Sequence, residues 1–448
     1  MYYKTNIMKK KLFIFTLAGL FTAHMSAQKI LTLEDCLRTG IENNLSLKDK
    51  RNEIRKGKYA ISENRAKLLP QINGFANFND NFRQPVSVTD GSSYGVPYNV
   101  TNTLQYNASA GIQLQMPLYN QTVYTAISIS QTMDRLNQLS YEKAREDLMM
   151  EISKLYYLGQ ATTEQLELIK SNITRLTELK DITVAFFDNG MAMEVDVKRV
   201  NINLENLAVQ YDNAKAMLAQ QLNMLKYMID YPAEQEISLT PVKTNDIMSV
   251  ELTGLSEDLY ELRMLESQKE LAEKQKKMIT QGYLPSLSLS GNLSFSAYTD
   301  KARYWFHTNP SNKWYDACGL GLSLRIPLFD GLDKKYKAQK ARIEIENIRL
   351  AQENTRKNLQ TQYLNATNDL MNSQRNYRKQ KDNYQLAEDV YTVTSDRYKE
   401  GIASMTEVLQ DEMRMTEAQN NYLNAHYNYR ITNLTLLKLT GKINSLIN

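Results

Sequence analysis

The chain has few residues of the types that carry catalysis. Its three histidines, His24, His307 and His426, are far apart, and none stands at metal-ligand spacing from a cysteine or a carboxylate cluster. No glycine-rich phosphate-binding loop occurs either. Cys36 and Cys318 fall in segments of different predicted type, so neither a disulfide framework nor a zinc site is expected. We therefore expect no enzymatic activity, no cofactor and no resident metal.

Two carboxylates stand at matching places in the two halves of the chain. Gly190 is followed six residues later by Asp196, and Gly401 is followed six residues later by Glu407. Each glycine predicts a left-handed cap at the end of a helix. Each acid then lies near the start of the next helix, where the helix dipole favours negative charge. A solvated acid in that position is common, and this interpretation stays open beside a functional one.

The order of sequence signals in the first half recurs in the second half. The recurrences lie at nearly constant offsets of 215, 210 and 211 residues, which indicates a duplicated unit. We predict a first repeat over 28–230, a linker over 231–255 and a second repeat over 256–448. The matching pairs are Leu69-Pro70 with Leu284-Pro285, Met116-Pro117-Leu118-Tyr119 with Ile326-Pro327-Leu328-Phe329, and Gly190 with Gly401.

The N-terminus reads as a secretory signal over residues 1–27. Three lysines precede an apolar run from Leu12 to Phe21, and Met25-Ser26-Ala27 predicts the cleavage site. The apolar run is about half the ~20 residues of a membrane-spanning helix. The predicted signal accounts for the whole net positive charge of the chain, because the residues after it comprise 50 basic and 50 acidic side chains. A nucleic-acid partner is therefore not expected, and any membrane embedding has to use strands.

Two long segments predict uninterrupted helices. Residues 332–400 contain neither Gly nor Pro, and residues 118–189 contain only Gly159. At ~1.5 Å per residue, each helix would run roughly 100 Å. Apolar residues at three- and four-residue spacing predict lateral coiled-coil packing. Shorter helices, placed end to end along the long ones, are predicted over 32–69, 191–230, 256–284 and 402–440.

Alternating apolar and small polar residues predict four strands, in two hairpins over 71–116 and 286–326. The strands cover 71–82, 104–116, 286–298 and 314–326, and only Phe75 in the first is out of phase. Their lengths suit the ~9–11 residues of a tilted membrane strand, and aromatic residues gather near their ends. Residues 83–103 and 299–313 would be outer loops.

Four strands are too few to close a membrane barrel, because single-chain barrels begin at about eight strands. Copies of the chain must then pool their strands. Ser, Gly and Asn dominate the polar faces and are too small to fill an interior, which favours a water-filled trimer over a plugged dimer. The predicted fold class is mostly α with a membrane β-barrel. Long coiled-coil helices form a tunnel, and four strands per protomer contribute to a trimeric, twelve-stranded barrel.

A soluble β-sandwich has alternating strands as well. The chief alternative is therefore a soluble periplasmic coiled-coil scaffold or adaptor with a β-sandwich head, and a hydrolase is a distant third hypothesis. Strand length, the terminal aromatic residues and the export signal favour the membrane barrel.

The chain resembles the outer-membrane efflux family of TolC type over essentially its whole mature length. The resemblance implies a homotrimeric channel-tunnel in the outer-membrane lipid, with its helical part in the periplasm. It would be a passive exit duct that receives cargo from an inner-membrane pump through a periplasmic adaptor. The identity of the cargo is left open. The stretches that carry the resemblance are Leu31-Thr-Leu-Glu-Asp-Cys-Leu, Tyr398-Lys-Glu-Gly401, Glu407-Val408-Leu409, Tyr427-Asn428-Tyr429 and Leu439-Thr440-Gly441.

The same resemblance implies a gate near Gly190 and Gly401, the turns that an adaptor would contact. Asp196 and Tyr398 would form a closing hydrogen bond, and Glu407 would contribute one carboxylate per protomer to a cation-selective ring. The chain departs from the family pattern at two places, where Ala403 replaces an arginine and Gln410, with Asp411 beside it, replaces an acid. A thinner closing network is expected.

Overall fold

The structure is a computed structural model that describes residues 29–84, 86–102, 104–242, 253–301 and 313–447. The predicted signal, with His24, and the loop residue His307 lie outside these residues. The chain divides into two compact units, each assembled from both halves of the sequence. Unit 1 comprises Met1–Asp49, Glu142–Leu259 and Lys357–Asn448, and unit 2 comprises Lys50–Tyr141 and Tyr260–Arg356.

The two long helices form as predicted. Helix α4 (Gln121–Asp188) has 68 residues and α7 (Asp333–Lys399) has 67, without a break in either. Inside α4, Gly159 leaves room for the Leu239 side chain, which lies 2.7 Å from where a Cβ would be. No helix in the described part of the chain is long and apolar enough to cross a membrane. The shorter helices are α2 (Leu33–Asn43), α3 (Leu45–Ala66), α5 (Glu194–Met228), α6 (Tyr260–Gln281) and α8 (Met405–Leu439). Short 3-10 turns are η1 (Ser92–Tyr94) and η3 (Ile443–Leu446).

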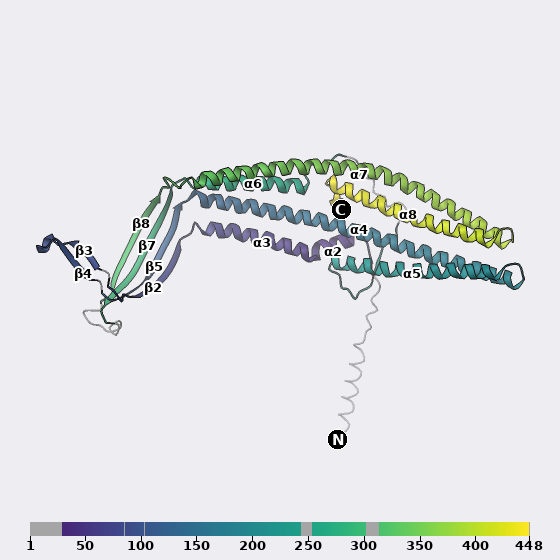
Figure 1. The fold of residues 1–448 in the computed structure, drawn as a ribbon, viewed down its shortest axis with the longest axis horizontal. Coiled ribbons are helices and arrows are strands. Elements are labelled where there is room, and N and C mark those ends of the chain that lie inside the picture. The colour runs from purple at the N-terminus through teal and green to yellow at the C-terminus, as the bar shows by residue number, and fades with distance from the viewer. Residues whose placement is uncertain (1–28, 85, 103, 243–252, 302–312, 448) are drawn as a thin grey trace, which may run out of the picture. The chain divides into compact units, whose positions relative to one another are not determined.

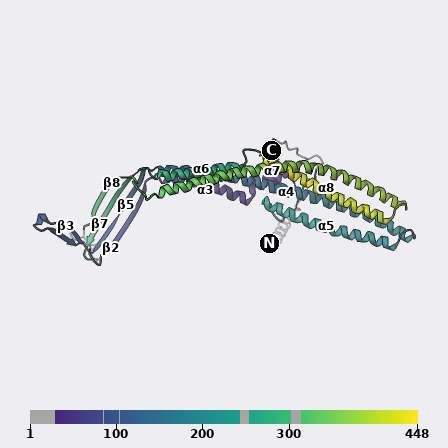
Figure 2. The ribbon, with the colours of Figure 1, turned by 45° about the horizontal axis from the view of Figure 1, so that its top comes forward.

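Helices α5 and α8 fold back along the helices that precede them, α4 and α7 (Figures 1 and 2). The prediction of a single helix over 32–69 is wrong, because two helices, α2 and α3, are separated at Asn44. The Asn44 carboxamide oxygen caps α3 by accepting from the N–H of Ser46 (2.9 Å), and its Nδ2 donates to the carbonyl of Met228 (2.8 Å). The break therefore joins the start of α3 to the end of α5.

Unit 1 contains a short parallel pair of strands, β1 (Lys29–Leu31) and β6 (Ile237–Leu239). Strand β6 lies inside the predicted linker 231–255, so that segment is more than a polar connection; residues 243–252 of it lie outside the described residues. The pair closes over a core that includes Leu37, Leu225 and Leu434, and the buried Tyr156 hydroxyl donates to the Leu31 carbonyl (3.1 Å).

Unit 2 contains one four-stranded antiparallel sheet in the order β2-β5-β7-β8. The two predicted hairpins are thus joined through β5 and β7. Among the described residues, neither β2 nor β8 pairs with a strand on its outer edge. The strands are β2 (Gln71–Asp80), β5 (Tyr106–Tyr119), β7 (Ser286–Thr299) and β8 (Tyr315–Arg325).

The sheet has one polar face and one apolar face. A row on the polar face runs through Gln71, Gln115, Ser290 and Gly321, and the adjacent row on the apolar face runs through Ile72, Leu114, Gly291 and Leu320. The apolar face is bare: Leu320 is 78% exposed and Ile72 is 67% exposed. The described residues contain no second sheet packed on this face, so the β-sandwich head of the alternative hypothesis is missing from them.

Phe75 is out of phase with the alternation of its strand, as predicted, and one other detail of the sheet differs from the predicted pattern. Phe75 is on the polar face because it lies opposite Gly111, and a Cβ on Gly111 would meet both its ring (3.0 Å) and the Leu293 carbonyl (2.3 Å). Strand β5 does not end at residue 116 but continues through Pro117 to Tyr119. It does so with a bulge, which accommodates a proline in a central strand.

The predicted outer loop 83–103 is also more structured than expected. It holds an antiparallel hairpin, β3 (Val86–Asp90) and β4 (Tyr98–Asn102), with Val88 opposite Val100. This hairpin is not evident from the sequence. Each of its strands has five residues, many of them polar, which is too few for an alternation of apolar and polar residues to be recognised.

Candidate functional site

The turns at Gly190 and Gly401 have the same backbone hydrogen bonds, 211 positions apart. The Gly190 N–H donates to the carbonyl of Phe187 (2.9 Å), and the next N–H donates to that of Phe186 (2.8 Å). The Gly401 N–H donates to the carbonyl of Tyr398 (2.9 Å), and the next donates to that of Arg397 (2.8 Å). With φ values of 72° and 75°, both glycines complete Schellman caps.

Glu407 caps the helix that follows the second turn. Its Oε2 accepts from the Ser404 N–H (2.7 Å) and from the Ser404 hydroxyl (3.0 Å), and the Ser404 Oγ in turn accepts from the Glu407 N–H (3.3 Å). These bonds to Ser404, with the charge of Arg397, lower the pKa of the Glu407 carboxyl. Glu407 is therefore an exposed, ionised carboxylate with fixed orientation.

Tyr398 binds a different partner from the predicted one. Its buried hydroxyl donates to Thr183 Oγ1 on α4 (3.3 Å), and its ring lies 5.6 Å from that of Phe186. Within the described protomer, the expected hydrogen bond from Tyr398 to Asp196 is not formed. Burial, with a smaller contribution from the charge of Asp196, raises the pKa of Tyr398. The tyrosine joins α7 to α4 rather than to α5.

Asp196 is instead paired with Arg199, a residue that the sequence reasoning missed. Arg199 Nη1 lies 3.2 Å from Asp196 Oδ1 and 3.1 Å from Thr406 Oγ1. Asp196 Oδ2 also accepts from the Met193 N–H at the start of α5 (3.4 Å). The guanidinium therefore links the first turn of α5 to the first turn of α8. An arginine three residues after an acid at a helix start was the available signal.

Gln410 and Asp411 lie one turn further along α8, and they differ in their surroundings. Gln410 is exposed. Asp411 accepts from the Thr394 hydroxyl on α7 (2.8 Å) and from Arg414 (3.3 Å), and only 13% of its side chain is exposed. Asp411 thus fastens α8 to α7 within one helical hairpin.

A shared apolar core holds these turns together. It takes residues from α4, α5, α7 and α8, all within unit 1. Leu179, Val200, Tyr391, Val408 and Met415 are buried in it. The two helical hairpins therefore pack as one body beneath their turns, and the link from Arg199 to Thr406 lies at its end.

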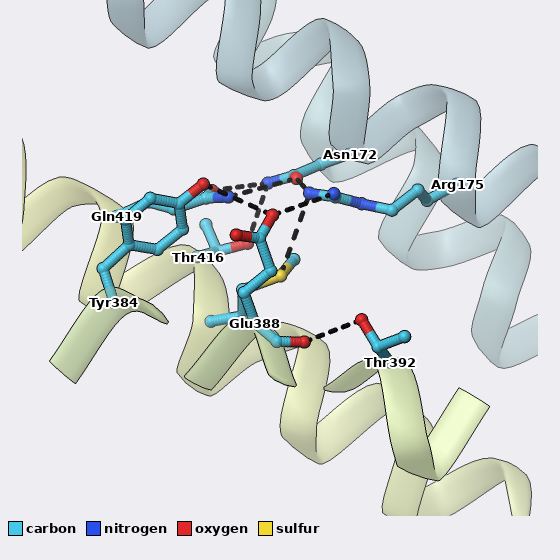
Figure 3. Close-up of polar contacts among 8 residues, drawn as sticks. Asn172, Arg175, Tyr384, Glu388, Thr392, Thr416 and Gln419 are labelled. Carbon is cyan, nitrogen blue, oxygen red and sulfur yellow. Dashed lines mark hydrogen bonds and ion pairs between the residues drawn. The ribbon is translucent and has the colours of Figure 1, made fainter. Parts of the chain in front are cut away.

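A buried polar cluster joins α4 to α7 and α8 within the same unit (Figure 3). Asn172 Nδ2 donates to Gln419 Oε1 (2.9 Å) and to Thr416 Oγ1 (3.2 Å). Arg175 donates to Asn172 Oδ1 and forms an ion pair with Glu388 (3.5 Å). Asn172 and Gln419 are almost fully buried, so their hydrogen bonds fix one register of α4 against α8.

Glu412 lies next to this polar cluster and is 4% exposed. It accepts from the Thr416 hydroxyl (3.0 Å), and burial raises the pKa of its carboxyl despite the opposing charge of Arg175. The described residues contain no group of three or more His, Cys, Asp and Glu that could hold a metal ion.

Comparison with known families decides which class of protein has this fold. The family model described as "Outer membrane efflux protein" matches residues 37–229 and 259–442, which is most of the chain. The chain belongs to the outer membrane efflux protein family. The outer membrane is accordingly the location of this family member, and its helical part lies in the periplasm.

Individual relatives are distant. The outer membrane protein TolC of Vibrio cholerae serotype O1 is 22% identical over 281 residues, which cover 61% of this chain and 59% of the relative. The matched region thus spans less than two thirds of that relative's length. TolC of Escherichia coli K12 is 19% identical over 392 residues, covering 86% of this chain and 77% of the relative.

Solved structures agree on the fold. The crystal structure of the outer membrane protein VceC from Vibrio cholerae superposes with a TM-score of 0.72 at 14% identity, covering 91% of this chain and 96% of VceC. At that identity the likeness establishes the fold alone.

Proposed function

We propose that this chain forms the outer-membrane exit duct of an efflux or secretion system. The observation that carries the proposal is the four-stranded sheet, with one bare apolar face, one polar face and two unpaired outer edges among the described residues. An edge exposed to lipid leaves backbone N–H and C=O groups without partners, at a cost of several kcal/mol for each group. Pairing β8 of one copy with β2 of the next removes that cost.

Three copies supply twelve strands and a homotrimeric barrel. Small side chains on the polar face, such as Ser290, Gly321 and Ser323, support a water-filled passage rather than a plugged one. The family match supports the assignment to efflux. In this proposal the duct is passive, and an inner-membrane pump supplies the energy through a periplasmic adaptor.

The periplasmic end of the duct closes at the two helical turns. Glu407 and Asp196 carry negative charge at the start of α8 and α5, and three copies of Glu407 around an axis would favour cations. Gln410 and Asp411 follow on α8, and Tyr398 holds α7 to α4. Gly190 and Gly401 shape the tips that an adaptor contacts. The exposed apolar residues beside them, Met191 and Ile402, supply a surface for that contact.

The deciding experiment measures the mass of the detergent-extracted particle, with the detergent contribution subtracted, together with conductance in planar bilayers. Three protomers and discrete conductance steps are the expected result. A monomer extracted without detergent would refute the duct and support the soluble scaffold with a coiled-coil body.

A further inference from the structure

A hollow of about 510 Å³ lies on the polar face of the sheet, where the strands meet the helices of unit 2. All four strands contribute to it, together with Lys67 at the end of α3. Its volume is in the range of sites for small organic molecules. The residues that decide its chemistry are Lys67, Arg325, Ser286, Ser288, Ser323 and Gln115.

The charges in this hollow all have one sign. Lys67 and Arg325 are the charged residues of its lining, and no carboxylate lines it. Arg325 is also the one charged residue at the polar-face positions of the four described strands. The wider surroundings have the same sign, since the sequence of unit 2 holds 25 basic and 16 acidic residues. An anion would therefore meet no local repulsion.

Neither cation is paired with a carboxylate of the described residues. Arg325 forms no hydrogen bond or ion pair with any residue that the structure describes, and Lys67 Nζ contacts only a neutral carboxamide oxygen, that of Asn64 (2.8 Å). A guanidinium presents a planar pair of donors that matches carboxylate, phosphate or sulfonate oxygens. The site thus offers one ligand the paired donors of the Arg325 guanidinium and the single positive charge of the Lys67 ammonium.

Hydroxyl groups flank the guanidinium at fixed positions. Ser286 is the cross-strand neighbour of Arg325, and Ser288 is the neighbour of Ser323. Pro117, Tyr119 and Leu287 add apolar surface to the lining. This combination suits an organic anion with an apolar or aromatic body, whose charged end contacts Arg325.

We infer that this hollow is a cargo-binding site for organic anions, repeated in each protomer inside the passage. The inference rests on the proposed function, because the polar face lines a passage only in the assembled duct. It deepens that function by naming a cargo class.

The test is equilibrium binding of 8-hydroxypyrene-1,3,6-trisulfonate, a fluorescent trianion, to the detergent-extracted protein at about 0.1 M salt, read by fluorescence anisotropy. Wild-type protein should bind the dye, and the double substitution Arg325→Gln with Lys67→Gln should weaken affinity about tenfold or more. Arg325→Lys keeps the charge but loses the paired donors, so an intermediate affinity is expected.

Lys313→Gln is the matched control, because it removes one positive charge just before the opposite end of β8. Its affinity should stay within about twofold of wild type, since the site is beyond the ~10 Å screening length at 0.1 M salt. Equal binding by the double variant and wild type would overturn the inference. Each hollow belongs to one chain, so a monomeric particle would refute the duct while leaving the binding result readable.

Discussion

Arg199 Nη1 lies 3.1 Å from Thr406 Oγ1, and this contact joins the starts of two helices that are more than 200 residues apart in sequence. Arg199→Met should loosen the two turns relative to one another. Exposed charged contacts contribute about 0.2–1 kcal/mol, so amide exchange at residues 191–200 and 402–409 should accelerate about 1.4- to fivefold. Lys198→Met is the control, because Lys198 pairs with Glu194 on its own helix. Equal acceleration in both variants would deny Arg199 a linking role.

A double-mutant cycle tests whether the hydroxyl of Tyr398 interacts with Thr183 or with Asp196. Tyr398→Phe with Thr183→Val should give a coupling energy of about 1 kcal/mol, because the buried hydrogen bond between them is lost once. Tyr398→Phe with Asp196→Asn should give a coupling close to zero. The measurement is the free energy of unfolding in urea. A larger coupling with Asp196 would restore the bond that the sequence reasoning expected.

Glu407→Gln removes a charge without removing the helix cap. Glutamine serves at the same position of a capping box, so the Ser404 N–H keeps an acceptor and stability should change by less than about 0.5 kcal/mol. Cation preference and divalent-cation block of single channels in planar bilayers should fall. Thermal unfolding of the same preparation separates the two effects. If selectivity and block are unchanged, Glu407 is a cap and nothing more.

Gly401→Ala should destabilise the second turn, because a φ of 75° places an alanine Cβ against the following carbonyl. The expected cost is about 1–2 kcal/mol. Gly401→Asn should cost less, since asparagine tolerates the left-handed region. Apart from its two chain neighbours, no part of the described protein lies within 4 Å of a Cβ at this position, so a clash with a distant residue cannot explain the difference. Equal losses for the two variants would contradict a conformational cause.

His426 should make unit 1 sensitive to acid. It is buried against the rings of Tyr377 and Tyr422, and burial, with the charges of Arg430 and Lys381, lowers its pKa to about 4. The unfolded chain has the higher pKa and takes up the proton first, so stability falls as pH drops from about 6.5 towards 4 and is flat above 7. The loss between pH 7 and pH 5 is about 2 kcal/mol.

His426→Phe keeps a ring in the stack and removes the titration. The difference in urea stability between wild type and this variant should therefore widen in favour of the variant as pH falls. Parallel pH profiles for the two proteins would show that His426 does not respond to acid in this range.

The long helices and the strands of the four-stranded sheet could be predicted because each depends on a local pattern that repeats many times. Residues 332–400 lack helix breakers, and the alternation in 286–298 spans a whole strand. In the strand 71–82, Phe75 interrupts the alternation, because its environment is set by Gly111 on the neighbouring strand. Cross-strand partners of this kind are invisible to a pattern along one strand.

The candidate site was predicted less completely, for a related reason. The glycine turns were found because a left-handed cap is a property of one segment. The break at Asn44 depends on the Met228 carbonyl, and the partner of Tyr398 is Thr183; both are tertiary contacts between distant segments. Spacing along the chain located the acids, but it did not indicate which cation or hydroxyl each would meet.

The ladder between β5 and β7 pairs Ile112 with Leu293, residues from opposite halves of the chain. Each further residue in the intervening loop adds little to the free-energy cost of closing that loop, but contacts between segments distant in sequence form slowly. During synthesis the first hairpin emerges well before Ser286 exists. An isolated two-stranded hairpin is marginally stable in water. One edge of β5 therefore stays open, and able to pair with other chains, until the second hairpin has joined it.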